Sequence, residues 1–132
     1  MYGHARSGSY ALDPDHTLLL QTLHTTPFRR FNVAIESDRA KQVLTDMADK
    51  LTTQDDGLIQ ADFNLNLPHI LDLFPLLAKA GFEEVPLTAV TTPKGEFYDH
   101  VLYKGLRLVR STVISTVNTD HYPIVTDFEF TL

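Results

Sequence analysis

The chain has 132 residues, of which 43% are hydrophobic and 21% charged, with a net charge of −6 at pH 7. This length suits one domain with one modest core. The acidic balance argues against broad binding to a nucleic-acid backbone, which usually needs a basic face, but a metal ion could still supply positive charge locally. The absence of cysteine excludes thiolate metal sites and disulfide frameworks.

No apolar run approaches the roughly 20 residues that a membrane-spanning helix needs. The first residues are not followed by an apolar stretch of the signal-peptide type. We therefore expect a soluble chain without a signal peptide, cytoplasmic by default, although a missing upstream segment could change this localisation.

The first half of the chain alternates between strand and helix patterns. Residues 1–16 are rich in Gly, Ser, His, Asp and Pro and are expected to form a loosely ordered lead-in, followed by a domain over 17–132. Residues 17–23 are apolar on both faces, as in a strand covered from two sides. Residues 37–51 have a helical apolar period, with Ser37 or Asp38 as the cap. Residues 58–63 form a short buried strand after an Asp-Asp-Gly turn.

The second half predicts one more helix and three strands. The helix runs from Pro68 to about Ala80, with Gly81 just past its end and Pro75 breaking or kinking it. Strands are expected at 97–103, 106–117 and 123–130, and the last of them alternates between apolar and polar residues.

The predicted order is β-α-β-α-β-β-β, which gives an α/β fold with a mixed β-sheet. Right-handed crossovers place both helices on one face of that sheet. The opposite face would then be bare, although the strands are apolar on both sides, and a bare apolar sheet face needs a cover. The pattern therefore indicates that part of the fold is missing or that the chain pairs with a partner.

Polar groups follow one buried strand directly. Asp62 and Asn64 are two residues apart at its end, where an α/β sheet presents side chains to a ligand. Such a pair can hold a water or a metal with one group and an oxyanion with the other. The structural alternative is that one of them caps the next segment or forms an Asx-turn.

Three further strand ends carry groups of similar chemistry. Asp120 and His121 precede the last strand. An Asp beside a His can fix the tautomer of the imidazole or coordinate a metal together with it. Asp99 opens another strand, and His24 closes the first one. Each has a plain structural alternative: a polar turn, a strand-end hydrogen bond, or a surface histidine.

Residues from about Thr17 to Phe130 resemble the C-terminal half of the endonuclease/exonuclease/phosphatase superfamily, which has the DNase I-like fold. The resemblance rests on motifs that follow in the family's order. They are a strand ending in His24, an Arg-x-x-Gln helix (39–42), a Gly-Asp-Phe-Asn sequence (61–64), a strand with Asp99-His100, and a fairly specific Ser-Asp-His-x-Pro-Ile sequence (119–124). Two positions depart mildly, because Ala61 replaces the glycine and Thr119 the serine.

The resemblance implies a fold and a set of roles. The fold would be one half of a four-layer α/β-sandwich, and the activity would be metal-dependent phosphoester hydrolysis with Mg²⁺ or Mn²⁺. Asp62 would orient or deprotonate the attacking water, and Asn64 would stabilise the phosphoryl oxygens. His121 would contact the scissile phosphate, with Asp120 beside it as orienter or metal-side carboxylate. Asp99 would support the site, and His24 would lie against the phosphate or the leaving group.

The length is the main departure from the family pattern. Members are roughly twice as long, and their N-terminal half supplies an Asn and a Glu that hold the metal. Nothing in residues 1–16 replaces these ligands. The bare sheet face and the absent ligands both predict half of a fold.

Two hypotheses remain open at this point. The first is a phosphoesterase acting on a phosphate ester, possibly nucleic acid, completed by a missing N-terminal half. The second is a catalytically inactive half-domain that acts as a homodimeric binding or assembly module. Arg29 and Arg30 are candidate phosphate contacts; Lys104, Arg107 and Arg110 are weaker ones, and solvated surface is the alternative for all five.

Overall fold

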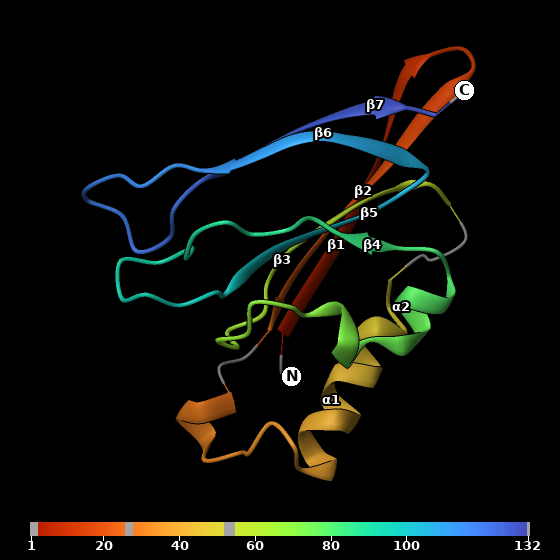
Figure 1. The fold of residues 1–132 in the computed structure, drawn as a ribbon. Coiled ribbons are helices and arrows are strands. Elements are labelled where there is room, and N and C mark those ends of the chain that lie inside the picture. Colours follow the sequence, from red (N-terminus) through yellow and green to blue (C-terminus); the bar gives the residue numbers. More distant parts are fainter. Residues whose placement is uncertain (1–2, 26–27, 52–54, 132) are drawn as a thin grey trace.

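A computed structural model describes residues 3–25, 28–51 and 55–131. Figure 1 shows the α-helices below a central sheet and a long hairpin above it. The elements are β1 (Gly3–Asp13), β2 (His16–Thr25), a 3₁₀ helix η1 (Phe28–Phe31), α1 (Asp38–Ala48), β3 (Gly57–Asp62), a 3₁₀ helix η2 (Leu71–Leu73), α2 (Pro75–Lys79), β4 (Glu83–Glu84), β5 (Asp99–Lys104), β6 (Leu106–Val113) and β7 (Ile124–Phe130).

The central sheet has five strands in the order β1-β2-β3-β5-β4. β2 and β3 pair in parallel, and the other pairs are antiparallel. β6 and β7 form a separate antiparallel hairpin. The predicted α/β class with a mixed sheet is therefore confirmed.

One face of the sheet carries the main core. Ser37 caps α1 by accepting a hydrogen bond from the backbone N–H of Ala40, and the apolar stripe of this helix packs on the sheet. Leu23, Ile59 and Leu102 meet it from β2, β3 and β5. Residues from α2 belong to the same cluster, and Figure 1 shows both helices on this side. The predicted placement of the helices on one face is confirmed.

The opposite face is only partly bare, because the β6–β7 hairpin packs over it. Tyr103 and Phe128 contact each other with ring centroids 5.1 Å apart, and Val101 and Leu106 are buried beside them. Leu18 and Leu58 pack at the margin of this second cluster and stay half-buried. The expected bare face therefore has a partial cover from within the chain.

Residues 3–13 form β1, so the expectation of a loosely ordered lead-in over 1–16 missed a strand. β1 pairs with β2 along nearly its whole length. It lies at the edge of the sheet, and its described side chains between Arg6 and Ser9 are exposed. Backbone hydrogen bonds hold such a strand whatever its side chains are, so hydropathy gives no signal for it.

The predicted helix from Pro68 to Ala80 is in fact two short pieces. Pro75 occupies the first turn of α2, where its missing N–H needs no partner, so the chain breaks before it as predicted. Gly81 follows α2 with φ +99°, a conformation that favours glycine. β4 was not predicted, because two residues are too few for a pattern, and β6 ends at Val113 rather than at 117.

No helix in the described ranges is both long and apolar enough to cross a membrane.

Ile59→Ala should lower the free energy of unfolding by about 2–5 kcal/mol, because it leaves a cavity in the core. Ile59 lies on the central strand β3 and is 0% exposed. Leu76→Ala is the matched control: Leu76 is 55% exposed, and the change should be within about 0.5 kcal/mol. Urea unfolding followed by circular dichroism measures both. Equal losses in the two variants would contradict this placement of the core.

Candidate active site

The ends of three neighbouring strands lie side by side at one end of the sheet. In the parallel β2–β3 pair His24 lies opposite Asp62, and in the antiparallel β3–β5 pair Asp62 lies opposite Asp99. β2 and β3 finish at this end of the sheet, while β5 begins there. The register therefore sets the three side chains in a row, although they are far apart in the sequence.

His121 joins this row from the loop before β7. Its Nδ1 lies 2.7 Å from Asp99 Oδ2, and its Nε2 lies 3.7 Å from Asp62 Oδ2. A carboxylate only accepts hydrogen bonds, so Nδ1 carries a proton and donates a hydrogen bond to Asp99. The opposite edge of the ring then faces Asp62 and the open side of the site.

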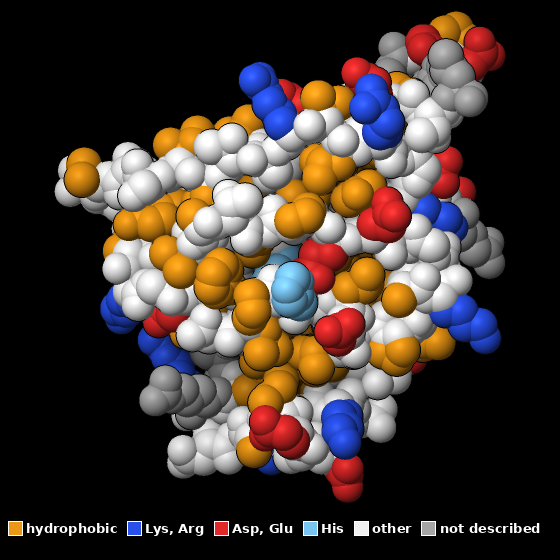
Figure 2. Space-filling model, in the orientation of Figure 1, with side chains coloured by type: hydrophobic (Ala, Val, Ile, Leu, Met, Phe, Trp, Pro, Cys, Tyr) orange, Lys and Arg blue, Asp and Glu red, His pale blue; other side chains and the backbone are white. Residues whose placement is uncertain are grey.

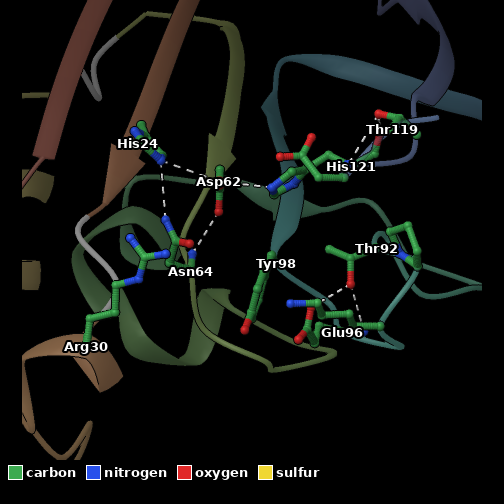
Figure 3. Close-up of a pocket in the computed structure, with 12 residues that line it drawn as sticks. His24, Arg30, Asp62, Asn64, Thr92, Glu96, Tyr98, Thr119 and His121 are labelled. Carbon is green, nitrogen blue, oxygen red and sulfur yellow. Dashed lines mark hydrogen bonds and ion pairs between the residues drawn. The ribbon is translucent and has the colours of Figure 1, made fainter.

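Asp62 lies between two histidines. Its Oδ2 is 3.5 Å from His24 Nε2, and Figure 3 shows both rings directed at this carboxylate. The side chain of His24 is 58% exposed, whereas those of Asp62 and Asp99 are about one-fifth exposed. The carboxylates therefore sit within the protein surface, with His24 as the accessible group.

Asn64 adopts a left-handed backbone conformation, with φ +50°. Its backbone N–H donates to Asp62 Oδ1 at 2.9 Å, which is the Asx-turn weighed from the sequence. Its side-chain amide donates to the carbonyl oxygen of Thr25 at 2.7 Å and lies 3.3 Å from His24 Nε2. The Asx-turn is therefore confirmed and places the amide beside His24, while the functional role of Asn64 stays a prediction.

Thr25 fixes the same turn from β2. It is 1% exposed, and its hydroxyl donates to the carbonyl oxygen of Phe63. Its carbonyl oxygen accepts from Asn64. Sequence analysis missed Thr25, because a threonine at a strand end carries no pattern of its own.

The surroundings shift two of the pKa values. Burial raises the pKa of Asp62 above its ordinary value; the nearby charge of Asp99 adds to this rise, while the N–H of Asn64 and the two histidines oppose it. Burial alone would lower the pKa of His121, but the hydrogen bond to Asp99 and the charges of Asp99, Asp62 and Asp120 together raise it. Asp62 thus holds a proton more readily, and His121 is favoured as the imidazolium.

These groups border a pocket of about 780 Å³. In Figure 3 the His24, Asp62 and Asn64 side chains lie on one side, His121 and Thr119 on another, and Tyr98 stands between Asn64 and Glu96. The residues that line the pocket are His24, Arg30, Asp62, Asn64, Thr92, Pro93, Lys94, Glu96, Tyr98, Thr119, Asp120 and His121. Thr92, Lys94 and Glu96 come from the loop between β4 and β5, for which nothing was predicted from the sequence, and Tyr98 lies just before β5 although the strand was expected to begin at residue 97.

The candidate cations separate into two groups. Arg30 lines the pocket. Arg107 and Arg110 pair with Glu129 and Asp127 on the β6–β7 hairpin, and Lys104 lies over the ring of Phe82, so these three do not line it. The side chain of Arg29 lies outside the described residues. On the face shown in Figure 2, Lys and Arg lie around the rim, and the middle carries hydrophobic side chains with a His and several acidic side chains among them.

His100, the second residue of the Asp99-His100 motif, faces away from the site. It is 1% exposed, with Nδ1 3.1 Å from Glu84 Oε1 and Nε2 3.0 Å from the carbonyl oxygen of Phe97. Burial opposes the charge of Glu84, but His100 and two backbone N–H groups outweigh burial and lower its pKa. This pair anchors β5 from behind and takes no part in the pocket.

Three groups of the site are close enough together to share a cation. One ligand atom each from Asp62, Asp99 and His121 lies within 4.8 Å of the others. Carboxylates suit hard cations such as Mg²⁺ or Mn²⁺, whereas an imidazole is a more usual ligand of Zn²⁺ or Fe²⁺, so the group by itself does not identify the ion. Asp120 lines the same pocket but is exposed and lies outside this group of three.

No protein-family profile matches the sequence, and no curated protein matches it. Solved structures do match. An endonuclease/exonuclease/phosphatase from Beutenbergia cavernae matches with TM-score 0.68 and 13% identity over 97% of this chain and 39% of its own. The mannosyl-6-phosphatase of Bacteroides thetaiotaomicron gives 0.59 and 15%, over 96% of this chain and 57% of its own. The catalytic domain of human Nocturnin, solved with a bound sulfate anion, gives 0.60 and 18%, over 98% and 53%.

The chain has the fold of part of an endonuclease/exonuclease/phosphatase domain. The expected resemblance and its DNase I-like fold are therefore confirmed. The chain spans about two-fifths to three-fifths of the length of the structures that it matches. At these identities the likeness concerns the fold, and the roles of single residues rest on the geometry described above.

The titration of His121 should test its pair with Asp99. We expect a midpoint above the ordinary value of 6.5, and Asp99→Asn should lower it, since the carboxylate stabilises the imidazolium. The measurement is an NMR titration of the ring protons in the presence of a chelator. Asp72→Asn, which removes an exposed acid on η2, is the control and should leave the midpoint in place. A midpoint unchanged by Asp99→Asn would contradict the pairing.

Asp62→Asn should make the folded chain more stable at neutral pH. Because the folded-state pKa of Asp62 is raised, its contribution to stability is fully present below the unfolded-state pKa and is lost as the pH rises through the folded-state value. Asparagine does not ionise, so the variant does not lose this stability as the pH rises, and its side-chain oxygen can still accept the hydrogen bond from the backbone N–H of Asn64. Urea unfolding at a series of pH values measures the gap between variant and wild type. A gap that does not grow from acid to neutral pH would count against the raised pKa.

Proposed function

We propose that this chain carries the water-activating and phosphate-binding part of a metal-dependent phosphoesterase site. The observation that supports this most directly is the arrangement around Asp62. One carboxylate lies between His24 and His121, the amide of Asn64 lies beside it, and all four line one pocket. A base and several hydrogen-bond donors that converge on one space are what the hydrolysis of a charged ester requires.

Each group has a role that its contacts suit. Asp62 takes the proton of the attacking water, and its raised pKa brings it nearer to the working pH of a general base. His121 donates from the ring edge opposite Asp99 to a phosphoryl oxygen, and Asn64 donates to another. His24 is exposed at the mouth of the pocket and lies against the leaving group. The oxygen of water bonds to phosphorus as the bond between phosphorus and the ester oxygen breaks, and the leaving oxygen takes a proton from solvent at the mouth of the pocket.

We assign the cation, Mg²⁺ or Mn²⁺, to the carboxylates of Asp62 and Asp99, with Asp120 as a further carboxylate on the pocket wall, while His121 keeps both ring N–H groups for hydrogen bonds. When bound, the ion would supply positive charge to the phosphoryl oxygens. The residues fit such an ion: burial first, and then the charge of Asp99, raise the pKa of Asp62, and a cation would relieve the repulsion between the two carboxylates.

The site also needs ligands from outside these residues. A second hollow of about 280 Å³, lined in part by Gln60, Val101 and Tyr122, borders Asp62 and Asp99 on the hairpin side of the sheet. It offers an approach for the Asn and Glu that the family's N-terminal half contributes. We therefore propose that such a half completes the enzyme.

The substrate is a phosphate ester, and nucleic acid is one candidate. Arg30 and Lys94 line the pocket and would meet an anionic substrate there.

The alternative, an inactive half-domain that dimerises through its bare sheet face, is not favoured. The β6–β7 hairpin covers part of that face, and the site groups hold contacts that a purely structural module would not need.

Hydrolysis of a generic phosphodiester by the purified chain, with Mn²⁺ or Mg²⁺, tests the proposal. Turnover should disappear with a chelator and fall by about 10²–10⁴-fold in Asp62→Asn, the range for loss of a general base. Asp72→Asn is the matched control, because it removes an exposed carboxylate far from the pocket.

If the chain alone is inactive, the same comparison should be made after an N-terminal half of the family is added in trans or by fusion. Turnover in that complex with equal rates for wild type and Asp62→Asn would overturn the role of Asp62. No turnover in either form would overturn the proposed function itself.

A further inference from the structure

Thr91 is a buried residue outside the pocket lining that holds two parts of the site together. It lies in the loop between β4 and β5 and is 0% exposed. Its hydroxyl accepts hydrogen bonds from the backbone N–H groups of Tyr98 at 3.0 Å and Asp99 at 3.2 Å, and it donates to the carbonyl oxygen of Glu96 at 3.3 Å. A hydroxyl has one donor and two acceptor positions, so its capacity is fully used.

The backbone of Thr91 binds a second segment. Its carbonyl oxygen accepts a hydrogen bond from the N–H of Tyr122 at 2.7 Å, and its own N–H donates to Glu96 at 2.8 Å. Tyr122 directly follows His121 in the loop before β7. One residue therefore holds the first residue of β5 through its side chain and the His121 loop through its main chain.

These two segments carry the two members of the Asp99–His121 pair. The partners are 22 positions apart, and their 2.7 Å hydrogen bond depends on how the start of β5 and the His121 loop are placed. Thr91 binds Asp99 itself and the neighbour of His121. Since a buried N–H that loses its acceptor is costly, the hydroxyl constrains the backbone of Asp99 strongly.

We propose that Thr91 is a positioning residue that sets the Asp99–His121 hydrogen bond through its buried hydroxyl. Its effect on turnover rests on the proposed function, but its effect on the pair does not. Thr91 touches no substrate, because it does not line the pocket.

Thr92 provides a matched control within the same loop. It is 3% exposed, and its hydroxyl donates to Glu96 Oε2 at 2.6 Å and accepts from the N–H of Glu96 at 3.2 Å. Both of these hydrogen bonds brace the turn at Glu96, and neither reaches Asp99 or the His121 loop. Loss of its hydroxyl therefore tests general loosening of the loop.

The experiment is NMR of the chain labelled with ¹⁵N-histidine, at one fixed pH and with a chelator present. Long-range ¹H–¹⁵N spectra identify which ring nitrogen of His121 carries the proton, and the hydrogen-bonded Nδ1–H is followed by its exchange with water. In Thr91→Val, which keeps the shape but removes the hydroxyl, this proton should exchange at least about tenfold faster, as expected for a lost buried hydrogen bond. Thr91→Ser and Thr92→Val should match the wild type.

An unchanged Nδ1–H signal in Thr91→Val would overturn the proposal, and so would an equal loss in Thr92→Val. If Thr91→Val does not fold, Thr91→Cys replaces it, because a thiol is a weaker acceptor. Faster exchange in Thr91→Cys with a normal signal in Thr91→Ser supports the hydroxyl; no difference between the two contradicts it.

A second readout uses the completed enzyme. Thr91→Val should lower kcat by about tenfold and leave KM within about twofold, since the pair acts on the reacting phosphate and not on substrate capture. If the wild type has no turnover, the proposed function fails, while the ring N–H measurement still decides the role of Thr91.

Discussion

The register of three neighbouring strands is the constraint on which the site depends. Parallel pairing sets His24 opposite Asp62, and antiparallel pairing sets Asp62 opposite Asp99. Groups from three parts of the chain therefore lie together at one end of the sheet. A slip of one residue would turn these side chains to the other face. The core protects the register, because Leu23, Ile59 and Leu102 from the same strands are buried under the helices. Packing on one face of the sheet therefore fixes the chemistry at its edge.

Buried polar residues extend this control to the loops. The sheet places Asp62 and Asp99, but Asn64 and His121 belong to irregular segments that backbone pairing alone does not fix. Thr25 holds the turn of Asn64, and Thr91 links the start of β5 to the loop of His121. A threonine hydroxyl suits such positions, since it is small and can satisfy more than one backbone group. Burial, joined by the nearby charge of Asp99, opposes the ionisation of Asp62 and raises its pKa.

The β6–β7 hairpin covers part of one face of the central sheet. Its inner side packs on the central sheet, while its outer side carries the paired side chains of Arg107 with Glu129 and Arg110 with Asp127. The matching structures are longer than this chain, which covers between 39% and 57% of them. A second hollow borders Asp62 and Asp99 on the hairpin side of the sheet, and we propose that further ligands would reach the site there.

The sequence by itself determined the order of most elements and the identity of the main polar groups. Periodicity located α1, β2, β3, β5 and β7, and the Asp62 and His121 motifs indicated the chemistry, because both are local patterns. β1 was not predicted from the sequence, because its pairing depends on the backbone. The contacts of the loop from Thr91 to Tyr98 were not predicted either, because turn residues carry no pattern that shows what they contact. Only the tertiary structure decided which groups meet. Cross-strand register and buried loop hydrogen bonds are long-range, and no spacing along the chain encodes that Asp99 pairs with His121 or that Thr91 supports both.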